Sequence, residues 1–106
     1  MRLVPKHFLK TVTTAGTRQQ LTTASIRVPS VDFQAKPGNG NRVFIGDSSV
    51  SSTNYMASLG PTDSLHLDAA VYGMAGAQWD LSDFWLDVGT SGEGLSVGYG
   101  ERKSAE

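Results

Sequence analysis

The segment of residues 31–50 constrains the fold more than any other stretch of the 106-residue chain. Val31, Phe33 and Ala35 occupy alternate positions, so they share one face of an extended strand, with polar residues on the other face. Residues 37–41 are Pro-Gly-Asn-Gly-Asn, which reverses a chain readily because glycine and asparagine tolerate positive φ. The Arg-Val-Phe-Ile sequence that follows favours a second strand. The segment therefore predicts a β-hairpin in an all-β protein.

Short β-branched or alternating segments recur along the rest of the chain. We expect strands at residues 12–14 and 21–28, at residues 64–68 with Leu65 and Leu67 facing inward, from about Phe84 to Val88, and over Leu95, Val97 and Tyr99 after a hairpin loop at residues 89–94. Their spacing of about 8–12 residues is typical of an antiparallel β-sandwich or a jelly-roll-like small barrel of about seven or eight short strands. Glycines argue against a helix in residues 69–78, which we interpret as a loop or an irregular strand.

The length and composition of the chain indicate one domain without disulfide bonds. The chain has no cysteine, which excludes disulfides and thiolate metal sites. We expect a basic arm over residues 1–10, a β domain over residues 11–100 and a flexible charged tail over residues 101–106. The arm has no continuous apolar run, so we expect neither a secretory signal peptide nor a membrane-spanning segment.

Charge is distributed unevenly behind a net value of -1. Residues 1–31 carry five basic side chains and no acidic one, whereas residues 32–106 carry ten acidic and four basic side chains. Such a split indicates that the basic part meets an acidic surface. That surface could belong to a neighbouring copy, to another protein or to nucleic acid. An aromatic–basic patch for stacking bases is missing, so a protein partner is the better interpretation.

No catalytic constellation is present, and we expect a non-enzymatic protein without a cofactor. His7 and His66 have no companion at metal-ligand spacing and are interpreted as surface residues. Asp80, Asp83 and Asp87 cluster around one predicted strand, where three carboxylates could bind Ca²⁺. Because Asp80-Leu-Ser also has the pattern of a turn or a cap, we predict no metal site.

Exposed aromatic and basic side chains are the candidates for partner contact. If the apolar residues of the 84–88 strand face the core, then Trp85 and Asp87 face outward. An outward tryptophan is a frequent interface anchor, although Trp85 packed under residues 69–78 is an equal alternative. We assign partner binding to residues of the arm and to this aromatic side chain: Arg2, Lys6, Phe8, Lys10 and Trp85.

Four motifs, in order within residues 22–99, resemble small virion proteins of tailed bacteriophages and prophages. They are RVFIGDSSV at Arg42–Val50, LGPTDSLHL at Leu59–Leu67, DLSDFWLD at Asp80–Asp87 and GLSVGY at Gly94–Tyr99. Thr62-Asp63 stands where that family usually has Gly-Glu, and residues 69–78 resemble an insertion. The resemblance does not cover the N-terminal arm.

The resemblance implies a non-enzymatic structural protein. We expect a capsid decoration (cement) protein that is made in the host cytoplasm, self-associates as a trimer and binds on the capsid surface across junctions between major capsid protein subunits. A tail, fibre-base or head–tail accessory protein is the alternative within a virion. A carbohydrate- or host-surface-binding module that uses Trp85, Tyr72 and Asp87 is the alternative outside it. We expect no membrane partner.

Overall fold

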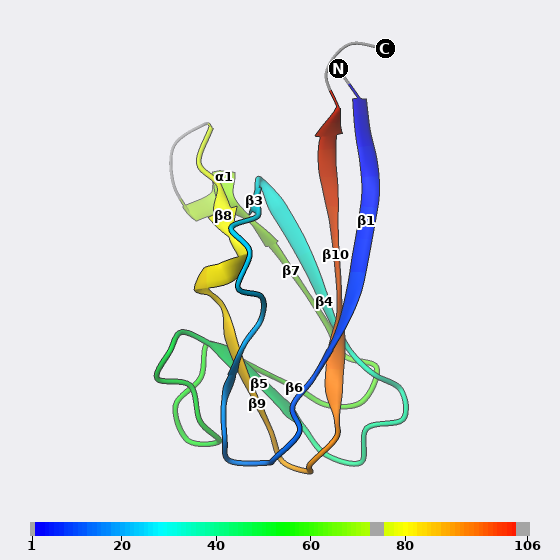
Figure 1. Ribbon diagram of the computed structural model, residues 1–106, viewed down its shortest axis with the longest axis vertical. Coiled ribbons are helices and arrows are strands. Elements are labelled where there is room, and N and C mark those ends of the chain that lie inside the picture. Colours follow the sequence, from blue (N-terminus) through cyan, green and yellow to red (C-terminus); the bar gives the residue numbers. More distant parts are fainter. Residues whose placement is uncertain (1, 73–75, 104–106) are drawn as a thin grey trace.

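Two four-stranded antiparallel sheets enclose the core in a computed structural model that describes residues 2–72 and 76–103 (Figure 1). The first sheet has the order β1 (Arg2–Thr11), β10 (Gly94–Lys103), β4 (Ser30–Ala35) and β7 (Ser64–Asp68). The second has the order β2 (Gln19–Gln20), β9 (Trp85–Val88), β5 (Val43–Gly46) and β6 (Ala57–Leu59). A third pair joins β3 (Arg27–Val28) to β8 (Trp79–Asp80). The predicted all-β antiparallel class is confirmed, and the jelly-roll arrangement stays a prediction.

Alternate residues of the strands point inward, so the hydrophobic core lies between the two sheets. Val31, Phe33 and Ala35 of β4 are fully buried, as their spacing predicts. Leu86 of β9 is buried on the opposite sheet, and the ring of Phe84 meets that of Phe33 edge-to-face at a centroid distance of 5.3 Å. Aromatic pairs in this geometry add to the stabilisation from burial. Leu67 and Leu95 are buried as well, and Leu65 is half-buried against the same core.

The predicted hairpin in residues 31–45 is wrong. β4 and β5 lie in different sheets, so residues 36–42 carry the chain from one sheet to the other. The hairpin predicted around residues 89–94 is wrong for the same reason, since β9 and β10 also belong to different sheets. Buried Asn39 joins the two crossings, because its Nδ2 donates to the Gly94 carbonyl at 2.8 Å and its Oδ1 accepts from the Gly94 amide at 3.3 Å.

Residues 2–10, predicted as part of a basic arm over residues 1–10, belong to β1 and do not form a separate arm; residue 1 lies outside the described residues. β1 pairs with β10 along its whole length, from Arg2 opposite Lys103 to Thr11 opposite Gly94. Pairing satisfies backbone donors and acceptors that β10 would otherwise expose at a sheet edge. Residues 101–103 of the predicted flexible tail belong to β10, and residues 104–106 lie outside the described residues.

Two further segments differ from the sequence-based predictions. Residues 12–14 turn instead of forming a strand, and of residues 21–28 only Arg27–Val28 is a strand. Thr22 Oγ1 accepts from the Ala24 amide at 3.2 Å, a local bond that competes with strand pairing. Residues 69–78 begin with one helical turn, and their residues 73–75 lie outside the described part.

The helices are short. The turn α1 (Ala69–Tyr72) begins where Asp68 Oδ1 accepts from the Ala70 amide at 3.0 Å. The 3-10 helix η1 spans Leu81–Asp83. Within the described ranges, no helix has the length and apolar character needed to cross a membrane.

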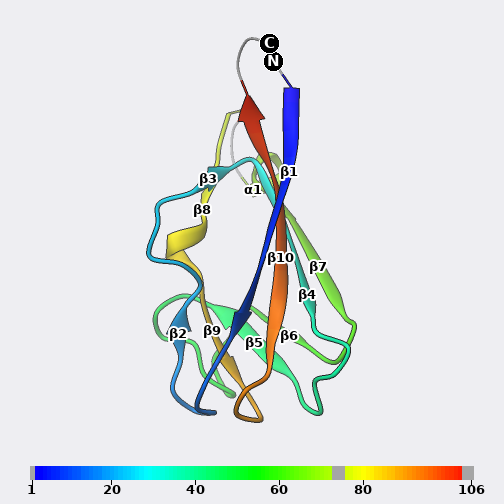
Figure 2. The ribbon, with the colours of Figure 1, turned by 45° about the vertical axis from the view of Figure 1, so that its right-hand side comes forward.

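A two-stranded extension projects from the first sheet (Figures 1 and 2). β4 pairs with β10 only from Leu95 to Tyr99, so residues 100–103 of β10 pair with residues 2–5 of β1 alone. We call residues 2–5 and 100–103 the β1–β10 ribbon. Both ends of the described chain lie side by side at its tip. The ribbon gives the molecule much of its elongation, with extents of 43 × 25 × 23 Å.

Candidate functional site

The outward face of β1 carries large apolar side chains in solvent. Leu3 and Leu9 are 62% and 65% exposed, and Pro5 and His7 are exposed between them at alternate positions. Phe8, on the opposite face, packs against the core. We call Leu3, Pro5, His7 and Leu9 the outer β1 row. Exposed leucines on one strand face make this row a candidate site of protein contact.

A shallow trough lies beside the outer β1 row. It has a volume of about 430 Å³ and runs past Gly98, with His7 and Asp32 among its walls. Gly98 stands opposite His7 on one side and Asp32 on the other, and a Cβ added to it would have no atom within 4 Å. The missing side chain therefore opens the trough. The outer β1 row thus forms a ridge on the outward face of the first sheet, and the trough forms a depression beside it.

Both histidines lie at the surface, as predicted. His66 Nδ1 lies 2.6 Å from Asp32 Oδ1 on the outward face of the first sheet, and both side chains are more than half exposed. His7 is exposed in the outer β1 row. Exposed pairs of this kind contribute little to the free energy of folding. Asp32 of the pair also gives the trough a polar wall.

The residues predicted to bind partners do not form one surface. Lys6, Phe8 and Lys10 lie on the core-facing side of β1, because they stand opposite Tyr99, Val97 and Leu95 of β10. Phe8 is half-buried against the core, and Lys6 Nζ lies 3.9 Å from Glu101 Oε1. Arg2 belongs to β1, but its side chain is outside the described part of the structure.

Trp85 lies on the other sheet and faces away from the core. It stands opposite Gln20 of β2 and Gly46 of β5, and it is half-buried. Its neighbour Leu86 takes the core position. The sequence analysis missed Leu3 and Leu9, although the period-two spacing of Leu3, Pro5, His7 and Leu9 would have signalled one apolar strand face.

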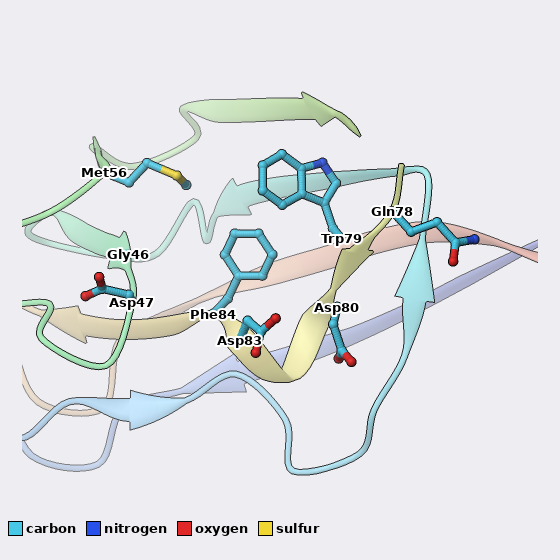
Figure 3. A pocket seen from close by; sticks show the side chains of 8 residues that line it. All are labelled: Gly46, Asp47, Met56, Gln78, Trp79, Asp80, Asp83 and Phe84. Carbon is cyan, nitrogen blue, oxygen red and sulfur yellow. The ribbon is translucent and has the colours of Figure 1, made fainter. Parts of the chain in front are cut away.

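A second surface feature is an open groove of about 320 Å³ at the end of the second sheet (Figure 3). Trp79 and Phe84 supply aromatic rings whose centroids are 5.6 Å apart, and Met56, half exposed, points toward them. Asp47, Asp80 and Asp83 also line it, together with Gly46 and Gln78. We call this the Trp79 groove. It combines an apolar wall with carboxylates.

Hydrogen bonds favour the charged form of two carboxylates of the Trp79 groove, Asp80 and Asp47. The Ser25 hydroxyl donates to Asp80 Oδ2 at 2.6 Å, and the Ser82 hydroxyl and amide donate to Asp80 Oδ1 at 2.7 and 3.0 Å. These bonds lower the pKa of Asp80 to about 2. The Ser49 hydroxyl and amide likewise lower the pKa of Asp47. Arg27, whose Nε lies 3.8 Å from Asp80 Oδ2, offsets part of this negative charge.

Asp87 does not face solvent, so the prediction of an outward carboxylate beside Trp85 is wrong. It is only 3% exposed, and its Oδ1 accepts from the Gly16 amide at 3.0 Å and from the Val88 amide at 2.8 Å. The loop before β2 thus covers Asp87, and the two backbone amides supply hydrogen bonds to its buried carboxyl group. Across residues 2–72 and 76–103, no three acidic or histidine side chains converge in a way that could hold a metal ion.

We compared the chain with protein families, curated proteins and solved structures. No protein family, no curated protein and no solved structure matches this chain. Functional arguments therefore start from the outer β1 row with its trough, from the Trp79 groove, and from the motif resemblance in the sequence.

Proposed function

We propose that this chain is a non-enzymatic structural protein of a tailed-phage virion, which decorates the capsid by binding across junctions between major capsid protein subunits. The observation that carries the proposal is the outer β1 row beside the trough on the first sheet. A rigid face with exposed leucines is suited to a permanent contact with another protein surface. The motif resemblance supplies the virion context.

Burial of the outer β1 row supplies the binding free energy in this proposal. Complete burial of one leucine side chain contributes roughly 1.5–3 kcal/mol. Leu3 and Leu9 at 62% and 65% exposure still have most of that burial to gain. A contact of this size is weak for a single copy. Many copies on one shell, linked to one another, would make it effective through multivalency.

Basic residues in and beside the β1–β10 ribbon favour an acidic partner surface. Arg2, Arg102 and Lys103 belong to the ribbon, and Lys6 follows it in β1. Charge complementarity at an interface steers association and sets orientation more than it sets affinity.

The copy number of this chain in purified particles tests the proposal. Quantitative mass spectrometry against the major capsid protein should give a ratio near one to one for a decoration protein. A few copies per hundred would overturn the capsid assignment and favour a tail, fibre-base or head–tail accessory protein. Absence from particles would overturn the virion assignment and favour a carbohydrate- or host-surface-binding module, in which the Trp79 groove would be the first site to examine.

A further inference from the structure

We propose that the Trp79 groove is the docking site for the β1–β10 ribbon of a second copy of this chain, so that copies associate head to tail. The first argument is the charge distribution. β1 and β10 together carry five basic residues and one acidic residue, whereas residues 12–93 carry four basic and eight acidic residues. Within the ribbon itself, three basic residues, Arg2, Arg102 and Lys103, stand against one acidic residue, Glu101, whereas three aspartates line the Trp79 groove. This difference in charge favours contact between the ribbon of one copy and the groove of another.

The groove has the chemistry that a lysine or arginine side chain needs. Trp79 is half-buried and offers an aromatic ring on which cations bind favourably, whereas Phe84 is only 6% exposed and packs behind it. Asp83 is exposed at the edge of the groove, and hydrogen bonds that favour the charged form lower the pKa of Asp47 and of Asp80. A basic strand pair can place its alkyl stems on the apolar wall and its charges on the carboxylates.

The ribbon has the properties of a segment that needs a partner. No third strand pairs with its two strands, and two-stranded antiparallel pairs are marginally stable in water. Insertion of the ribbon into a groove, with Leu3 left on its outer face, would stabilise both strands.

The ribbon cannot fill the groove of its own molecule. The residues that line the Trp79 groove come from β5, β8, the 3-10 helix and the adjoining loops, and none comes from β1 or β10. The ribbon is fixed by its continuity with the first sheet. Contact between ribbon and groove therefore requires two molecules. A head-to-tail contact of this kind closes into a ring, such as a trimer, when its rotation permits and otherwise continues as a chain.

Two variants that each remove one half of the contact give a decisive experiment. Asp83→Lys reverses the charge in the groove and leaves the ribbon intact. Arg102→Glu combined with Lys103→Glu reverses charge on the ribbon and leaves the groove intact. We expect the wild-type chain to form oligomers at low ionic strength in sedimentation velocity. Each variant alone should lose at least tenfold in association constant, on the order of the effect of like charges brought together at an interface.

Mixing identifies the contact as head to tail. An equimolar mixture of the two variants retains one intact ribbon and one intact groove per pair, so it should regain the association that each variant alone has lost. Asp63→Lys is the matched control, since it makes the same charge change on an exposed residue outside the groove, the trough and the ribbon. It should associate as the wild type does. Melting temperatures of all variants verify that each is folded.

Three outcomes would overturn the inference. The first is a wild-type chain that stays monomeric at its highest soluble concentration at low ionic strength. The second is a mixture of the two variants that stays monomeric although both are folded. The third is an equal loss of association in Asp63→Lys and in Asp83→Lys, which would show an effect of net charge and not of the groove. None of these measurements involves a virion, so the inference and the proposed capsid function can fail separately.

Discussion

At the scale of single residues, Asp80 fixes the entrance to the 3-10 helix through both carboxylate oxygens. It caps the helix through the Ser82 amide, and it reaches across to Ser25, which is 55 positions earlier in the chain. A capping residue that also joins two distant loops combines local and tertiary stabilisation. Asp80 is therefore a structural cap of the 3-10 helix.

The depressed pKa of Asp80 predicts a pH dependence of stability. Its folded-state value of about 2 lies below its ordinary 3.8, so the stabilisation is complete above about pH 4 and is lost as the pH falls toward 2. Urea unfolding at about pH 5 and about pH 2.5 should show a smaller loss for Asp80→Asn than for the wild type, since the variant has no charge to lose. Asp83→Asn serves as the control and should follow the wild type. Identical pH profiles for all three proteins would contradict this account of Asp80.

Leu9 is expected to act in binding and not in folding. Its side chain is 65% exposed, so Leu9→Ser should leave the melting temperature nearly unchanged. Loss of a buried leucine contact at each site should weaken attachment to particles roughly 10- to 100-fold. Val71→Ser is the control, because Val71 is 77% exposed on α1, away from the outer β1 row. Competition between labelled variant and wild type for particles measures the effect, and equal retention of Leu9→Ser would remove the outer β1 row from the interface.

At the scale of elements, the strand positions were more predictable than their connections. The alternation of Val31, Phe33 and Ala35 is a local property, and it identified β4 and its buried face. Residues 37–41 have the composition of a hairpin turn, yet the connection they belong to joins two sheets. The hydrogen bonds between buried Asn39 and Gly94 favour the connection between sheets over a hairpin. Because Asn39 and Gly94 are 55 positions apart, a pattern in neighbouring residues cannot predict this contact.

The candidate site was less predictable for a related reason. The alternation of Leu3 and Leu9 on one face of β1 is masked by Val4 and Phe8 on the other face, so the sequence predicted an arm there. Lys6 and Phe8 were chosen, whereas Leu3 and Leu9 form the exposed row. Trp79 and Met56 come together in the groove only through tertiary structure.

The close pairing of β1 and β10 predicts unequal effects of two glycine substitutions. A Cβ on Gly94 would lie 1.9 Å from the Lys10 carbonyl oxygen, whereas a Cβ on Gly98 would meet nothing within 4 Å. Gly94→Ala should therefore lower the free energy of unfolding by more than about 2 kcal/mol, because the clash is with backbone. Gly98→Ala should change it by less than about 0.5 kcal/mol. Urea denaturation of both variants checks this, and similar values would mean that the strands can separate at Gly94 without loss.

At the scale of the whole molecule, the separation of charge dominates the expected behaviour in solution. The paired strands β1 and β10 carry a net positive charge and residues 12–93 carry a net negative charge. Copies therefore attract where the strand pair of one meets the acidic surface of another. Such a distribution matters more for assembly than the net charge of -1.

Salt should therefore weaken self-association without unfolding the protein. Raising the monovalent salt concentration from about 0.01 M to about 1 M shortens the Debye length from about 30 Å to about 3 Å. The association constant measured by sedimentation should fall over that range, while the melting temperature stays nearly constant because the core is apolar. Association that strengthens with salt would instead indicate a contact dominated by apolar burial.

The pairing of β1 with β10 also has a consequence in time. Thr11 and its partner Gly94 are 83 positions apart, so β1 leaves the ribosome long before its partner strand exists. At roughly 5–20 residues per second, the delay is on the order of ten seconds. During that interval the unpaired strand presents Leu3, Phe8 and Leu9 together with its free backbone groups. We therefore expect the nascent chain to be most prone to aggregation in the interval between the synthesis of β1 and that of β10.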